Sequence, residues 1–228
     1  MKHPVKNPPR GINKYITIPV DGTLLLADLQ IPESANSLVI FAYELGGIRN
    51  HPRARHVARI MRESGLATLL CDLLTDEEEF EDEATAIYRN DVGLLARRLI
   101  AVTKWAAGNI DTRRLQKAYF GACTGGAAVL IAAATLPKLV NAAVSRGGRV
   151  DLAAKYLSRV ECPTLLIVGE QDAADVKLSK EAFDHLTCEK ELQIIPGASH
   201  LFGEPGTLEA MAQRSAKWLS CHLEKPDC

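Results

Sequence analysis

Short apolar runs alternate with longer amphipathic segments along most of the chain. The run 38–42 is short and apolar throughout, which is typical of a strand buried on both faces of a sheet. The segment 52–64 instead has helical spacing, with Pro52 in its first turn and Gly65 just past its end. The strands expected from such patterns are 15–20, 24–30, 38–42, 67–71, 118–120, 140–144, 164–168 and 191–195. The expected helices are 52–64, 85–107, 126–136, 174–186 and 208–223.

This order of elements predicts an α/β fold with a mostly parallel, twisted sheet and helices on both faces. Strands 15–20 and 24–30 flank the turn signal Asp21-Gly22 and are expected to pair antiparallel, and strand–helix units follow them. We expect a single domain over residues 15–228, preceded by a loose leader over residues 1–14. The acidic run 75–83 is expected to be a solvated loop or helix start, with a lid beside a site as the alternative.

Composition narrows the classes of function. The formal net charge of the 228 residues is −1, which gives no reason to expect a nucleic acid or an anionic membrane as partner. No apolar run approaches the roughly 18 residues that cross a bilayer. The six cysteines lack the paired spacing of a zinc site, and the N-terminus has no apolar signal segment. We therefore expect reduced thiols and a cytoplasmic protein.

Cys123 is the strongest candidate for a reactive residue. It lies in Gly121-Ala122-Cys123-Thr124-Gly125, between an expected strand and an expected helix, as a nucleophile elbow requires. The N–H of Thr124 would lie at a helix N-terminus, where it can stabilise an oxyanion and where the helix dipole favours a thiolate. The alternative is a buried core cysteine in a glycine-rich turn.

Two further residues follow expected strands and could complete a triad. His200 ends Pro196-Gly197-Ala198-Ser199-His200 and could act as general base, and Asp172 could orient its imidazole. Taken alone, His200 could be a surface or capping histidine and Asp172 the N-cap of the next helix. Glu170 and Asp175 are competing acids. The chain order nucleophile–acid–base favours Cys123, Asp172 and His200 acting together.

The sequence resembles the dienelactone hydrolase branch of the α/β-hydrolases over about residues 38–223. The segments that carry the resemblance are Phe41-Ala42-Tyr43-Glu44-Leu45-Gly46-Gly47, Gly121-Ala122-Cys123-Thr124-Gly125-Gly126, Gly169-Glu170-Gln171-Asp172 and Gly197-Ala198-Ser199-His200. Cysteine at the elbow is its specific sign, because most α/β-hydrolases have serine there. The resemblance implies the α/β-hydrolase fold and a Cys123–His200–Asp172 triad.

The resemblance also implies roles for the loop after the strand 38–42. Tyr43-Glu44 is similar to the Gln-Glu or Gln-Asp pair of dienelactone hydrolases, in which the acid holds the resting thiol and takes its proton when substrate arrives. Glu44 is therefore expected to activate Cys123, the N–H of Leu45 to be a second oxyanion donor, and Tyr43 to contact substrate. The alternative for Glu44 is an exposed loop glutamate.

One departure concerns the substrate. Dienelactone hydrolases bind a substrate carboxylate through arginines, one of them shortly after the catalytic histidine, where this chain has Glu204. Arg146 could supply a replacement cation, or it could be a structural or surface arginine. The segment Ser145-Arg146-Gly147-Gly148 also resembles serine-type relatives, so Cys123 could stand where a serine stood.

The sequence thus predicts a hydrolase of small esters, lactones or thioesters with a cysteine nucleophile. It needs no cofactor and no metal, since His51 and His56 are expected to be surface histidines and Asp72 a cap or turn residue. Two other functions remain open, a catalytically silent ligand-binding or redox-sensing protein and an acyltransferase. The natural substrate and the oligomeric state stay undetermined.

Overall fold

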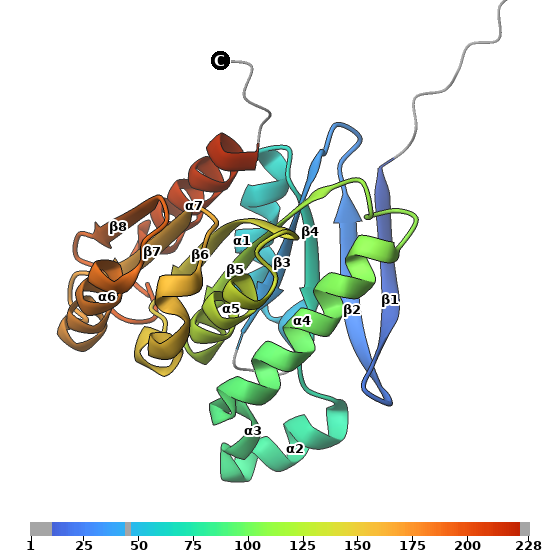
Figure 1. The fold of residues 1–228 in the computed structure, drawn as a ribbon, viewed down its shortest axis with the longest axis horizontal. Helices are drawn as coiled ribbons and strands as arrows, with labels where there is room; N and C mark the ends of the chain where they lie inside the picture. The colour runs from blue at the N-terminus through green and yellow to red at the C-terminus, as the bar shows by residue number, and fades with distance from the viewer. Residues whose placement is uncertain (1–10, 44–46, 224–228) are drawn as a thin grey trace, which may run out of the picture.

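The computed structural model describes residues 11–43 and 47–223, and its centre is one eight-stranded sheet (Figure 1). The strand order is β1-β2-β4-β3-β5-β6-β7-β8. The first two pairings, β1 with β2 and β2 with β4, are antiparallel, and all the others are parallel. The strands are β1 Ile12–Val20, β2 Thr23–Ile31, β3 Ser37–Ala42, β4 Ala67–Cys71, β5 Gln116–Ala122, β6 Val140–Arg146, β7 Thr164–Gly169 and β8 Lys190–Ile195.

Helices cover both faces of this sheet, as the sequence predicts. The α-helices are α1 Pro52–Glu63, α2 Asp76–Thr85, α3 Ile87–Asn90, α4 Val92–Gly108, α5 Thr124–Thr135, α6 Ala173–His185 and α7 Thr207–Leu223. Two 3₁₀ segments, η1 Ile48–Asn50 and η2 Val150–Arg159, complete the described elements. Helices α1 and α7 pack on one face, and α4, α5, α6 and η2 pack on the other. Among the described helices, none is long and apolar enough to span a membrane.

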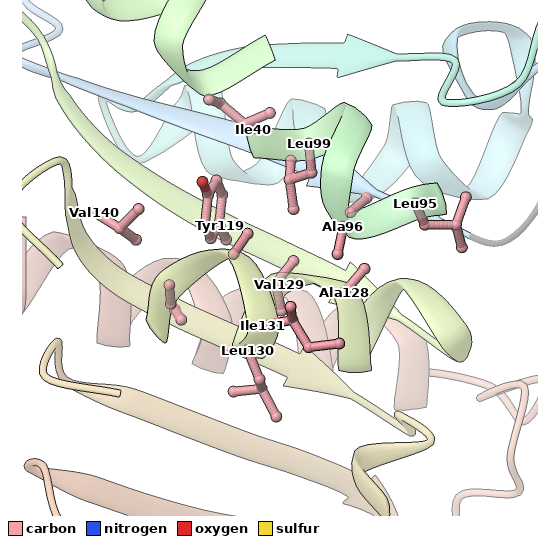
Figure 2. Close-up of a cluster of buried hydrophobic side chains, with 14 of the residues drawn as sticks. Ile40, Leu95, Ala96, Leu99, Tyr119, Ala128, Val129, Leu130, Ile131 and Val140 are labelled. Carbon is pink, nitrogen blue, oxygen red and sulfur yellow. The ribbon is translucent and has the colours of Figure 1, made fainter. Parts of the chain in front are cut away.

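The core over the central strands explains why α5 is so apolar. Its segment Thr124–Thr135 is buried at almost every position, because α4 and η2 flank it and the sheet lies beneath it. Figure 2 shows Ala96 and Leu99 of α4 directed towards Ala128 and Val129 of α5, with Tyr119 of β5 nearby. This packing fixes the N-terminal end of α5, where Cys123 lies.

Most boundaries agree with the sequence patterns, but two expectations are wrong. Strand β1 begins at Ile12, so residues 12–14 belong to the sheet and not to a loose leader. The helix expected over 85–107 is interrupted: residues 87–90 form the short helix α3 and α4 begins at Val92, because Ala86 adopts a left-handed conformation (φ 55°) and Asp91 caps a new helix.

The acidic run 75–83 is mostly helix α2. Thr75 and Glu78 form a reciprocal capping box, and the acidic side chains of the first turn suit the positive end of the helix dipole. Of the two structures expected for this run, a solvated loop or a helix start, the helix start is observed, and it continues as a full helix. Residues 1–10 and 224–228 lie outside the described residues.

Candidate active site

Cys123 occupies a strained turn between β5 and α5. Its backbone has φ 52° and ψ −126°, a conformation that a non-glycine residue adopts only when its surroundings enforce it. The Cys123 N–H donates to the Arg146 carbonyl at 3.3 Å, and the Cys123 carbonyl accepts from the N–H groups of Gly126 and Arg149 at 2.9 and 3.1 Å. The ends of β6 and η2 thus hold the turn that presents the thiol.

Glycines allow this turn to pack closely. A Cβ atom at Gly125 would lie 2.2 Å from the Ala42 carbonyl oxygen, and one at Gly121 would lie 2.4 Å from the Gly125 oxygen. Only glycine permits such approaches between backbones. The Gly-x-Cys-x-Gly pattern is therefore required by the packing of α5 against the ends of β3 and β5.

Thr124 is the first residue of α5, so the helix itself offers no acceptor for its N–H. This is the position that the sequence assigns to an oxyanion donor. Thr124 is buried (3% exposed), and its hydroxyl donates to the Arg89 carbonyl at 2.7 Å. This bond ties α3 to the elbow, so the α2–α3 segment adjoins the site.

His200 lies between the thiol and two acids. Its Nε2 atom is 3.5 Å from Cys123 Sγ, and its Nδ1 atom is 2.7 Å from Asp172 Oδ2. The Nδ1 atom is also 3.0 Å from Oδ2 of Asp175. The structure therefore brings the three residues of the expected triad together and adds a second carboxyl group.

Asp172 serves two purposes at the start of α6. Its Oδ1 atom accepts the Asp175 N–H at 3.1 Å and caps the helix, while its Oδ2 atom meets His200. Both interpretations of Asp172, helix cap and imidazole partner, are thus compatible. Glu170, the other competing acid, accepts the Gly197 N–H at 2.8 Å and supports the loop that carries His200.

The same loop has further supports. Glu204 accepts the Ser199 N–H at 3.0 Å, and this backbone hydrogen bond, as the largest cause, holds the pKa of Glu204 below its usual value. The acid that stands where the family has an arginine therefore stabilises the His200 loop. Arg146 Nη1 donates to the His200 carbonyl at 3.2 Å, and its guanidinium lies 5.3 Å from the centre of the Phe202 ring.

A cavity of about 250 Å³ opens beside Cys123. Its lining is mainly apolar, with two arginines and one histidine among the polar groups. The residues that line it are Tyr43, Ile48, His51, Arg53, Cys123, Arg146, Leu201 and Leu208. Arg146 and Tyr43, both expected to contact substrate, are thus at the pocket. His51 also lines it, so the expectation of a surface position is wrong for His51, while His56 lies on α1.

Two features of the pocket were not expected from the sequence. Arg53 of α1 donates to the carbonyls of Leu201 and Phe202, the latter at 3.2 Å, which joins α1 to the His200 loop. Tyr43 has its pKa raised to about 12, chiefly by burial, while the nearby Arg146 guanidinium opposes the rise. The Tyr43 phenol therefore stays neutral at physiological pH.

Two expected site residues cannot be placed. Glu44 and Leu45 lie outside the described residues, so their roles remain predictions.

Asp72, expected to be a cap or turn residue, accepts from the Arg49 N–H at 3.2 Å and pairs with the Arg49 side chain. In the described residues, donor atoms that could converge on a metal come from Asp172, Asp175 and His200. The Oδ2 atoms of Asp172 and Asp175 lie within hydrogen-bonding distance of His200 Nδ1, which suits an acid–imidazole arrangement.

Comparisons with known proteins identify the family of the chain. The sequence profile of the Dienelactone hydrolase family matches residues 25–222. The chain belongs to the dienelactone hydrolase family. The crystal structure of a dienelactone hydrolase from Anabaena variabilis is 46% identical, with a TM-score of 0.91 over 94% of this chain and 100% of that one. The resemblance read from the sequence and the α/β-hydrolase fold are thereby confirmed, and the family is one of hydrolases.

More distant and differently named relatives also match. Est1E from Butyrivibrio proteoclasticus shares the fold at 18% identity, with a TM-score of 0.76 over 92% of this chain and 99% of that one. A protein of Mycobacterium tuberculosis named putative phosphoribosyl transferase is 46% identical over 198 residues. These residues are 87% of this chain and 44% of that relative, so the chain spans less than half of the curated relative.

Proposed function

We propose that the protein hydrolyses small esters, lactones or thioesters through a cysteine nucleophile, Cys123, with His200 as base and Asp172 as its orienting acid. The observation that carries this proposal is the pair of contacts that joins Cys123, His200 and Asp172 at the C-terminal ends of the parallel strands. Cys123 Sγ lies 3.5 Å from His200 Nε2, and His200 Nδ1 lies 2.7 Å from Asp172. A nucleophile within reach of a base, and a base within reach of an acid, is the arrangement that acyl transfer requires.

The chemistry then follows from the positions of the atoms. His200 Nε2 takes the thiol proton as Cys123 Sγ forms a bond to the carbonyl carbon, and the carbonyl oxygen becomes an oxyanion. The Thr124 N–H at the start of α5 stabilises that charge, with the N–H of Leu45 proposed as the second donor. His200 gives its proton to the leaving oxygen or sulfur. It then deprotonates a water molecule, whose attack breaks the C–S bond and restores the thiol.

Glu44 keeps the role that the family resemblance implies. We propose that it holds the resting thiol and assists its deprotonation once substrate is bound. A carboxylate beside a thiolate repels it, so Glu44 has to move or become protonated as the thiolate forms. The rate of Cys123 alkylation and its pH profile would change in Glu44→Gln if this role is correct.

The cavity supports compact substrates. Its volume of about 250 Å³ and its apolar wall suit a small acyl group, while Arg53 and Arg146 give one side positive charge. Each guanidinium has five N–H donors, and the backbone carbonyls of the His200 loop use only part of them. We therefore propose that anionic esters or lactones bind better than neutral ones. The tetrahedral intermediate expels the Cys123 thiolate more readily than a poor leaving group such as an amine. Activated esters, which have good leaving groups, are therefore preferred to amides.

The decisive test replaces the nucleophile. Cys123→Ala should abolish turnover of p-nitrophenyl acetate and the transient acyl-enzyme mass seen by rapid-quench mass spectrometry. Cys221→Ala, which removes an exposed thiol of α7, is the matched control and should retain both. Full turnover by Cys123→Ala would overturn the proposal. Product analysis with competing alcohol or thiol acceptors separates hydrolysis from acyl transfer.

Two other activities are less well supported. The name phosphoribosyl transferase belongs to a relative of which this chain spans 44%, and the activity of that whole protein need not lie in the matched part. A silent, redox-sensing protein would need no base at the thiol, whereas His200 lies 3.5 Å from Cys123 and is itself oriented by acids. Absence of turnover over a broad ester panel, with selective peroxide oxidation of Cys123, would favour that alternative.

A further inference from the structure

Two carboxyl groups meet a single imidazole nitrogen in this site. The Oδ2 atoms of Asp172 and Asp175 lie 2.7 and 3.0 Å from His200 Nδ1. Nδ1 can donate only one proton, so it cannot satisfy two ionised carboxylates fully. A triad needs one acid at this position, and the second acid therefore requires an explanation.

The two acids also contact each other. The Asp175 N–H donates to Asp172 Oδ1 at 3.1 Å, and the two side chains are within hydrogen-bonding reach. Two negative charges at this separation repel strongly, and the repulsion favours a state in which one of the carboxyl groups retains a proton. A shared proton converts the repulsion into an O–H···O⁻ hydrogen bond, which is among the stronger kinds in proteins.

Burial favours Asp175 as the acid of the pair that binds a proton. Asp175 is 6% exposed, and burial, followed by the charge of Asp172, raises its pKa above the usual value. Burial also acts to raise the pKa of Asp172, but the Asp175 N–H and His200 outweigh it and leave that pKa lowered. Within the described part of the chain, Arg149 also interacts electrostatically with Asp175, but it pairs mainly with Asp151 at 2.8 Å.

Gly147, the residue after β6, lies beside Asp175 and His200. A Cβ atom at Gly147, which has φ 48°, would lie 3.4 Å from Asp175 Oδ2 and 3.7 Å from the His200 ring. The Gly147 N–H is held by the Ile167 carbonyl at 2.9 Å. The segment just after β6 thus lies next to the second acid and the imidazole.

We propose that Asp175 is a positioning residue that stays protonated and donates its proton to Asp172, which accepts at the same time from His200 Nδ1–H. The proton remains on Asp175 throughout the reaction, so the acid pair carries one negative charge. The pair then holds His200 in the tautomer whose free Nε2 faces Cys123. This inference rests on the proposed triad, in which Asp172 is the ionised orienting acid.

Substitutions at the two acids distinguish their roles. Asp175→Ala removes the donor to Asp172 and should lower kcat at least tenfold, whereas Asp175→Asn keeps an N–H donor there and should restore most of that loss. Asp172→Asn places a donor against Nδ1, favours the wrong tautomer and should lower kcat roughly 100-fold or more. Asp184→Asn, an exposed acid on the same helix, controls for the loss of one charge and should match the wild type.

A readout independent of turnover comes from the histidine ring. In a Cys123→Ala background with ¹⁵N-labelled histidine, ring nitrogen shifts should report the Nδ1–H tautomer for His200, retained in Asp175→Asn and reversed in Asp172→Asn. This measurement does not depend on catalysis, so it decides the role of Asp175 even if Cys123 is not the nucleophile.

Three results would overturn the inference. Equal damage from Asp175→Asn and Asp172→Asn would mean that Asp175 is an ionised partner of His200. A wild-type kcat and tautomer in Asp175→Ala would leave the residue without a positioning role. Loss of activity in Asp175→Ala that Asp175→Asn does not restore would show that the hydrogen-bond donor is not what matters.

Discussion

Replacing Gly125 by alanine tests whether the close packing at the elbow is what sets the thiol in place. The added Cβ would lie 2.2 Å from the Ala42 carbonyl oxygen, 2.6 Å from its carbonyl carbon and 2.9 Å from Tyr43 Cα. All three contacts are to backbone atoms, so no side-chain rotation can relieve them. The start of α5 and the end of β3 must separate by about 1.2 Å to reach the 3.4 Å of ordinary contact.

The size of the effect follows from that displacement. Overpacking in a close-packed interior costs about 1–3 kcal/mol, and contacts between backbones belong at the upper end of this range. For a chain of this length, ~3 kcal/mol lowers Tm by roughly 6–12 °C. Gly125 lies two residues after Cys123, so the thiol shifts relative to His200, and a 1 Å misplacement can reduce kcat/KM about 100-fold.

Thermal unfolding and ester turnover measure the two effects separately. Gly108→Ala is the matched control, because it adds the same methyl group at the last residue of α4, where no atom lies within 4 Å of the new Cβ. The control should leave activity unchanged and stabilise the fold by about 0.5 kcal/mol. A Gly125→Ala protein with the Tm and kcat/KM of the wild type would refute the reasoning.

Three further predictions concern charge and thiol chemistry. Arg53→Met should raise KM for p-nitrophenyl hemisuccinate about tenfold more, or 1.4 kcal/mol more, than KM for p-nitrophenyl acetate; equal changes for both esters would exclude a charge effect. Arg98→Met should lower the free energy of unfolding at pH 7 by about 2 kcal/mol, less than for a fully buried pair because the Glu78 side chain is 21% exposed. The hydrogen bond from Arg98 lowers the pKa of Glu78 in the folded protein. The stability from this pair is therefore present above the unfolded pKa of about 4.3 and is lost as pH falls. The urea midpoints of the wild type and Arg98→Met should therefore converge towards pH 3. Burial raises the pKa of Cys162 to about 12, so iodoacetamide should leave this thiol unmodified at pH 8 until the protein unfolds, and rapid modification in the native state would contradict its burial.

Local patterns made the elbow predictable. The glycines around Cys123, and the change from strand to helix at that point, are visible within a few residues of sequence. Asp172 and His200 could be placed near Cys123 because loops after neighbouring parallel strands meet at one edge of the sheet. Their distances to the thiol could not be predicted, since these depend on the packing of the whole sheet.

The features that were missed depend on contacts between distant segments. Arg53 reaches the carbonyl of Leu201, 148 residues away, and no local pattern announces that contact. Asp175 could be named only as a competitor of Asp172, because both acids belong to the first turn of one helix and either could face His200. Ala86 carries no signal for the left-handed conformation that separates α2 from α3.

The place of β8 in the sheet has a consequence for how activity is lost. Cys123 follows an interior strand, whereas His200 follows β8, which among the described strands pairs only with β7 and is only partly buried. Edge elements open through local fluctuations that cost less free energy than global unfolding. The nucleophile and its base thus belong to regions of unequal local stability. Inactivation under mild denaturation would then begin with separation of the base from an elbow that is still folded.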